Sequence, residues 1–259
     1  MYPVILQIGP FTLSSLWLFS VMGVIVGVQV ALLMIKKRKL KLNIFFEYPL
    51  IFIIVPLIAG RLIGVLLNLF NRFESQTSLT VLQIFKFWDQ KFSLWGALVA
   101  FIIIMIVILH KKKEPFLPWL DVLSIPVLVG LTFINIGKYL DGSGYGRPTN
   151  LPWGVTFENI DVTYTVPIHP TQIYQFIYTV LIIILSIYIS KKYHFLDKDG
   201  YLGLYPMFIY FICRFIEEFF RGDNTLMIGP VRLNQIITIM IIGTIGFVIF
   251  TKSKREFNL

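Results

Sequence analysis

Seven apolar runs, each close to the length needed to cross a lipid bilayer, constrain this chain more than any other feature. They fall at residues 12–35, 46–70, 94–110, 117–137, 170–190, 201–220 and 231–251. A membrane-spanning helix needs about 20 apolar residues. With 56% hydrophobic and only 14% charged side chains, the chain has too little polar surface for a soluble domain. The sequence therefore predicts an all-α polytopic membrane protein with seven transmembrane helices, formed as one domain over residues 1–259.

The basic side chains are concentrated on one side of the expected bundle. Fourteen of the 23 lysines and arginines follow the first, third, fifth and seventh runs, in short loops. Because such loops stay in the cytoplasm, we expect the N-terminus outside and the C-terminus in the cytoplasm. The net charge of +9 then reflects topology and contact with anionic lipid, and we expect no nucleic-acid partner.

Two segments on the expected outer side are longer than simple connections. Residues 71–93 contain several aromatic and aliphatic side chains, which predicts an interfacial arm lying along the membrane surface. Residues 138–169 are rich in glycine, proline and polar groups, which favours turns over helix. We therefore expect a small extracytoplasmic head there, with the functional site in or just beneath it.

Charged side chains inside the apolar runs are costly and usually functional. Arg61 lies within the second run, and Arg214, Glu217, Glu218 and Arg221 lie at the end of the sixth. Offsets of three and four place the latter group on one helical face, so Arg214 and Glu218 can pair. The pattern fits either an ion pair that stabilises the bundle or a polar cavity, and we favour the cavity because separate segments bring such groups to one depth.

Two further residues lie on the same expected side. Arg147 belongs to the head, and His169 precedes Pro170, where we expect it to cap the fifth helix. Arginine presents a fork of donors that matches phosphate, so the cavity suits an anionic lipid headgroup. The spacing alone does not separate a catalyst from a transporter, although no helix is broken in the manner of a transporter.

Cys213, the single cysteine, excludes a disulfide framework and a cysteine-based zinc site. Beside Arg214 it invites comparison with a nucleophile, yet a buried thiol in a membrane helix is more often an inert small hydrophobe. We expect no metal and no cofactor.

Several motifs occur in an order that resembles a known family. They are Gly146-Arg147-Pro148-Thr149, Leu151-Pro152-Trp153-Gly154, His169-Pro170-Thr171-Gln172-Ile173-Tyr174 and the segment from Arg214 through Arg221. In these the chain is similar to the prolipoprotein diacylglyceryl transferases. The resemblance implies a multi-pass protein of the bacterial cytoplasmic membrane that moves a diacylglyceryl group from phosphatidylglycerol to the lipobox cysteine of a prolipoprotein. We expect it to act as a monomer.

The resemblance also implies roles for particular residues. Arg214 would hold the lipid phosphate with Glu218 orienting it, while Arg147 and His169 would line the cavity on the head side as catalytic residues. The expected substrate-binding residues are Arg61, Lys138, Asp141, Gly142, Tyr145, Gly146, Gln172, Tyr174, Arg221 and Gln235.

Departures from the family pattern fall on one cluster. Trp95 stands where the family has a histidine, and Asn135 stands where it has a lipid-contacting arginine. Lys138 could supply the missing positive charge, and Asp141 or His169 could serve as base. Two alternatives therefore stay open: a transferase-like paralogue with another lipid or acceptor, and a non-catalytic lipid-binding relative.

Overall fold

A computed structural model describes residues 2–8, 11–72, 93–157, 162–192 and 199–257. Residues 73–92, nearly all of the expected interfacial arm, lie outside the described residues. The chain forms two compact units, one made of Met1–Arg38 with Leu117–Leu259 and the other of Lys39–Phe116.

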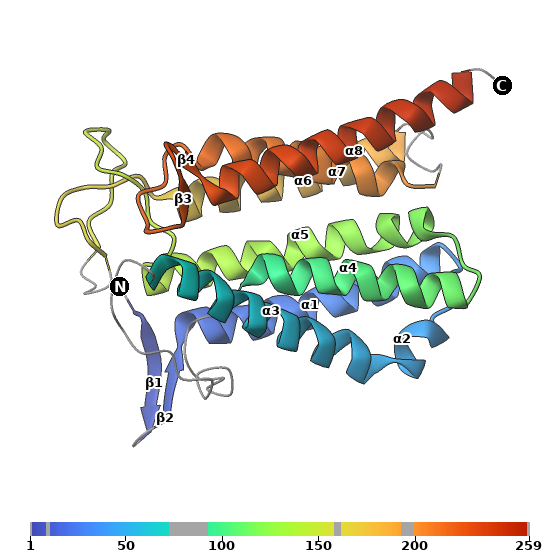
Figure 1. The fold of residues 1–259 in the computed structure, drawn as a ribbon, viewed down its shortest axis with the longest axis horizontal. Coiled ribbons are helices and arrows are strands. Elements are labelled where there is room, and N and C mark those ends of the chain that lie inside the picture. The colour runs from blue at the N-terminus through green and yellow to red at the C-terminus, as the bar shows by residue number, and fades with distance from the viewer. Residues whose placement is uncertain (1, 9–10, 73–92, 158–161, 193–198, 258–259) are drawn as a thin grey trace. The chain divides into compact units, whose positions relative to one another are not determined.

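Each of the seven apolar runs overlaps a helix (Figure 1). The first unit contains α1 (Ser15–Lys37), α5 (Phe116–Asp141), α6 (Thr171–Lys192), α7 (Tyr201–Glu217) and α8 (Leu233–Phe257). The second contains α2 (Asn43–Glu47), α3 (Pro49–Arg72) and α4 (Leu94–Lys111). Among the described residues, five helices are long and apolar enough to span a bilayer, namely α1, α3, α5, α6 and α8. The protein is therefore a polytopic, predominantly helical membrane protein.

The first helix begins later than its apolar run because a β-hairpin precedes it. Strand β1 (Val4–Ile8) pairs antiparallel with β2 (Phe11–Ser14). The Ser14 side chain then accepts a hydrogen bond from the Trp17 backbone N–H at 3.2 Å, an N-cap that fixes the start of α1.

Glycines allow α1 and α5 to approach closely. A Cβ placed on Gly23 would lie 2.8 Å from the Gly130 carbonyl oxygen, and one on Gly27 would lie 3.1 Å from that of Pro126. Small residues at such positions bring two membrane helices together, so van der Waals contact between backbones holds this pair.

Helix α7 packs against both α6 and α8 and is anchored at its start by α5. Both carboxylate oxygens of Asp121 on α5 accept backbone N–H groups, one from Gly200 and one from Gly203, each at 2.7 Å. Asp121 is fully buried, and the Arg38 guanidinium lies 3.7 Å from it. Since the first N–H groups of a helix have no partner within the helix, Asp121 acts as a cap supplied by a neighbouring helix.

The head follows α5, which continues to Asp141, beyond the expected end at residue 137. Short bridges join Pro148 and Val155 to Ile168, around a small core of Tyr145, Phe157, Val162 and Ile168. A second hairpin, β3 (Met227–Ile228) with β4 (Val231–Arg232), leads directly into α8. In the second unit α3 packs on α4, where the Ser93 N–H donates to the Gly60 carbonyl at 2.9 Å.

Candidate functional site

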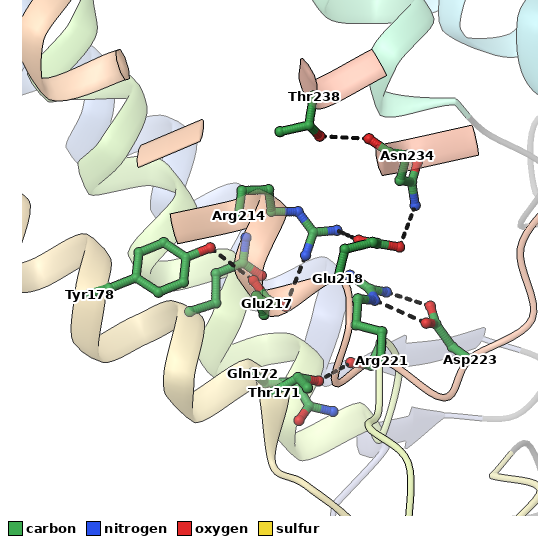
Figure 2. Close-up of polar contacts among 12 residues, drawn as sticks. Thr171, Gln172, Tyr178, Arg214, Glu217, Glu218, Arg221, Asp223, Asn234 and Thr238 are labelled. Atoms are coloured by element: carbon green, nitrogen blue, oxygen red, sulfur yellow. Dashed lines mark hydrogen bonds and ion pairs between the residues drawn. The ribbon is translucent and has the colours of Figure 1, made fainter. Parts of the chain in front are cut away.

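Arg214, in the last turn of α7, is the centre of a buried charged network (Figure 2). Its guanidinium forms ion pairs with Glu217, at 2.8 Å, and with Glu218, at 3.1 Å. The predicted pairing of Arg214 with Glu218 is thus confirmed, and Glu217 joins it. The pairs join Nη1 of Arg214 to Oε1 of Glu217 and Nη2 of Arg214 to Oε2 of Glu218, so both terminal nitrogens of the guanidinium contact a carboxylate.

A second arginine, Arg232 from β4, closes the network from the side of α8. Its Nε donates to Glu218 at 2.8 Å, and its Nη2 donates to the Asp223 carboxylate at 2.8 Å. Arg221 also donates to Asp223, through Nε at 2.9 Å and through Nη2 (Figure 2). Strand β4 and the loop that follows α7 are therefore both tied to the end of α7.

The network itself is close to electrically neutral, since three arginines (Arg214, Arg221, Arg232) face three carboxylates (Glu217, Glu218, Asp223). The half-buried Lys138 ammonium of α5 interacts electrostatically with Arg221, Arg214 and Glu217. It adds one positive charge to a balanced set. The site as a whole therefore favours an anion.

Asp223 lies outside the membrane helices and remains ionised at neutral pH. Burial raises the pKa of its carboxyl, but the hydrogen bond from Arg221 and the charges of Arg221 and Arg232 more than offset this effect, so the pKa falls below its ordinary value. A carboxylate held by two arginines keeps the loop after α7 in one conformation.

The head is joined to the end of α7 through its backbone. Gly146 forms a bridge with Arg221 and donates its N–H to the His169 carbonyl at 3.1 Å. The Arg147 N–H donates to the Phe220 carbonyl at 2.8 Å. A Cβ on Gly146 would lie 2.4 Å from the His169 oxygen, so only glycine fits there. The Arg147 side chain is exposed, and its Nε donates to the Arg221 carbonyl.

His169 belongs to a chain of polar aromatic contacts at the start of α6. Its Nδ1 lies 3.1 Å from the Tyr174 hydroxyl, which also accepts the Trp153 indole N–H at 2.8 Å. The His169 side chain therefore contacts the Tyr174 hydroxyl, while its backbone carbonyl accepts the N–H of Thr171, the first residue of α6, at 2.9 Å. Burial lowers the pKa of His169, which keeps the imidazole neutral at neutral pH.

Two side chains in the first turn of α6 hold the turn that follows α5. The Thr171 hydroxyl donates to the Gly144 carbonyl at 2.6 Å, and Gln172 Nε2 donates to the Ser143 carbonyl at 2.9 Å. Gly144 itself has φ +69°, which favours glycine. The site is therefore built on a fixed junction of α5, α6 and the head.

The other sequence-predicted residues have various placements. The Gln235 side chain accepts the Arg232 backbone N–H at 3.1 Å and so fixes the backbone that carries the Arg232 side chain. The Tyr145 hydroxyl pairs with Thr163 within the head, at 2.8 Å. Gly142 has φ +83° and ends α5 beside Asp141. Arg61 is buried in the second unit.

Asn135 lies three residues before Lys138 on α5 and is 1% exposed. Neither atom of its amide group has a hydrogen-bond partner within the described residues. A buried polar group left unpaired costs about 1–3 kcal/mol, so this position is suited to contact with a ligand or water rather than to stability.

An apolar groove of about 210 Å³ runs along α6 and α7 beside the network. It is lined by Tyr174, Tyr178, Cys213, Ile216, Glu217 and Phe220. Glu217 is thus shared between the groove and the charged network, and Oε2 of its carboxylate accepts the Tyr178 hydroxyl at 2.8 Å (Figure 2).

Sequence reasoning missed Arg232 and Tyr178. Arg232 is an arginine at the start of the last apolar run (231–251), on the side expected to be poor in basic residues, and that position was an available signal. Tyr178 carried no signal, because one tyrosine in an apolar helix is common and its contact with Glu217 arises from helix packing.

Comparison with known proteins identifies the group to which this arrangement belongs. The family model for prolipoprotein diacylglyceryl transferase matches residues 3–251. The chain belongs to this family. Among curated relatives, the phosphatidylglycerol–prolipoprotein diacylglyceryl transferase of Rickettsia typhi is 33% identical over 91% of both chains. That of Rickettsia canadensis is 32% identical over 93% of this chain and 94% of the relative. That of Finegoldia magna is 27% identical over 95% and 94%.

Proposed function

We propose that this protein transfers the diacylglyceryl group of phosphatidylglycerol to the lipobox cysteine of a prolipoprotein, a step of lipoprotein maturation. The observation that carries the proposal is the buried Arg214 network in a chain of this family. A purely structural bundle has little use for several buried charges, because taking ions out of water is costly.

The reaction displaces glycerol phosphate from the glycerol C3 carbon of the lipid. The attacking group is the cysteine thiolate, and the leaving group is a phosphate monoester whose negative charge grows as the C–O bond breaks. Cations held in a water-poor site stabilise such charge effectively. Arg214 takes this role, because its guanidinium carries five N–H donors and, within the described residues, its ion pairs with Glu217 and Glu218 engage two of them.

The neighbouring residues position Arg214 and complete the charge. Glu218 bridges Arg214 and Arg232, and Arg221 is fixed by Asp223. The resemblance implies an arginine at position 135, where this chain has the neutral Asn135. Lys138 supplies the positive charge instead. Arg147 and His169 lie on the head side, where the peptide acceptor arrives.

The topology in this proposal has seven spans. Helices α4 and α7 join the five longer apolar helices in crossing the membrane, with the N-terminus outside and the C-terminus in the cytoplasm. The distribution of basic loops supports this orientation. It places the Arg214 end of α7 and the head on the outer side of the bacterial cytoplasmic membrane.

The test is a transfer assay with purified protein in phosphatidylglycerol-containing nanodiscs. A lipobox peptide is added, and the thioether product is detected by its mass. We expect transfer by the parent protein and none by Arg214→Ala. Arg255→Ala, at the exposed far end of α8, is the matched control and retains full activity. A parent protein that binds the lipid yet forms no thioether would contradict the proposal.

A further inference from the structure

The groove along α6 and α7 meets the charged network at one side chain, Glu217. Its carboxylate lies 2.8 Å from Arg214 on one side and accepts the Tyr178 hydroxyl on the other, while Tyr178 also lines the groove. The walls of the groove are otherwise apolar or weakly polar, so a neutral thiol entering along it would reach a carboxylate directly beside the phosphate-binding arginine.

The other two carboxylates of the network are more fully engaged. Glu218 receives Arg232, Asn234 and Arg214, and Asp223 receives two donors from Arg221 and one from Arg232. A carboxylate offers about four acceptor positions. Within the described part of the chain Glu217 has two partners, one on each oxygen, so it keeps the most acceptor capacity of the three.

His169 is less well placed to accept the proton of a thiol beside Arg214. Its Nδ1 is already opposite the Tyr174 hydroxyl, and its ring packs against Phe220 at a centroid distance of 5.2 Å.

We propose that Glu217 is the base that removes the proton from the acceptor cysteine, a role that rests on the function proposed above. Phosphate binding to Arg214 draws the guanidinium toward the anion, which loosens its pairing with Glu217 and frees the carboxylate. The S–H bond breaks as the proton passes to Glu217. The thiolate then forms the S–C bond to the glycerol carbon as the C–O bond breaks, and glycerol phosphate leaves with the electron pair. The proton returns from Glu217 to the departing phosphate.

Charged and titratable groups from three helices face Glu217 and set the pH response. They are Arg214, Tyr210, Cys213 and, beyond the helix end, Arg221 from the α7 segment, Tyr178 from α6, and Lys138 from α5. Three of them, Arg214, Arg221 and Lys138, are cations, so Glu217 lies in positively charged surroundings.

The decisive experiment compares Glu217→Gln with the parent protein at several pH values. We expect the turnover number of the variant to fall about 100- to 1,000-fold at neutral pH, with binding of phosphatidylglycerol unchanged. Its rate should then rise about tenfold per pH unit until the free thiol ionises near pH 8.5, because the peptide must supply its own thiolate. A lipobox peptide with selenocysteine, whose selenol is ionised at neutral pH, should restore the variant to within a few-fold of the parent.

Glu218→Gln serves as the matched control, since it removes a neighbouring charge from the same network. Its loss of rate should be the same for both peptides and at every pH. An active parent with an equally active Glu217→Gln overturns the role of Glu217 and leaves the proposed function standing. So does a loss that selenocysteine fails to rescue. A parent that binds lipid without forming thioether overturns both proposals.

Discussion

Helix α7 carries buried charge at both of its ends, and the two ends are built differently. At its start, both oxygens of Asp121 are occupied by backbone N–H groups of Gly200 and Gly203. At its end, Arg214 pairs with the side chains of Glu217 and Glu218 and with no backbone group among the described residues, and Glu217 borders a groove. A buried charged group whose hydrogen-bonding positions are filled by backbone groups holds the fold together. A buried charged group with hydrogen-bonding positions still unused is available to a ligand.

The largest loss of transfer activity should come from altering the Arg214 guanidinium. Arg214→Lys keeps the charge but replaces a planar fork with a single ammonium group, which can no longer reach Glu217, Glu218 and a phosphate together. We expect transfer to fall by about 100- to 1,000-fold. The measurement is the initial rate of thioether formation, with the melting temperature in detergent as a check on folding. If the variant were about as active as the parent, Arg214 would stabilise the fold, as Asp121 does, and would not bind the phosphate.

The opposite end of α7 should respond in stability rather than activity. Asp121→Ala leaves two buried backbone N–H groups without acceptors, and each such loss costs about 1–3 kcal/mol. Thermal unfolding in detergent should shift to clearly lower temperature, while the rate per folded molecule stays near that of the parent. A variant that unfolds normally but loses turnover would break the comparison.

Gly146→Ala tests whether the head must be held against the end of α7. The added methyl group would lie 2.4 Å from the His169 carbonyl oxygen, so the bridge between Gly146 and Arg221 must shift. We expect about a tenfold loss of transfer with a smaller loss of stability. Arg147→Ala leaves the backbone contact intact and removes the side-chain hydrogen bond to the Arg221 carbonyl, so it separates the loss of this side chain from backbone displacement. Equal rates for Gly146→Ala and the parent would show that the junction tolerates movement.

The smallest effect should be the pH dependence contributed by Asp223. Its pKa is lower in the folded protein than in the unfolded chain, so its stabilising contacts are present above the unfolded value of about 3.9 and are lost as pH falls through the folded value. Melting temperatures of the parent and Asp223→Asn should differ at pH 7 and converge below about pH 4. A constant difference across that range would mean that the charge of Asp223 contributes nothing.

Much of the fold could be predicted from the sequence because the bilayer imposes a simple rule on composition. Apolar runs gave all the long helices, and glycine with proline marked the head after Asp141. The spacing of Arg214 and Glu218 was sufficient for their pairing, since residues four apart share a helix face. Boundaries were less accurate where a hairpin and a cap shortened α1 and where α5 continued into the expected head.

What the sequence determined by itself was local or one-dimensional: helix periodicity, the asymmetry of the basic loops and the family motifs. Only the tertiary structure decided which distant groups meet. Arg232 of β4 donates to Glu218 at the end of α7, and Tyr178 of α6 donates to Glu217 of α7. Asp121 caps a helix that begins about 80 residues later. The physical reason is that hydrogen bonds and ion pairs act over about 3 Å. Their partners are therefore set by helix packing, and no residue spacing along the chain encodes that directly.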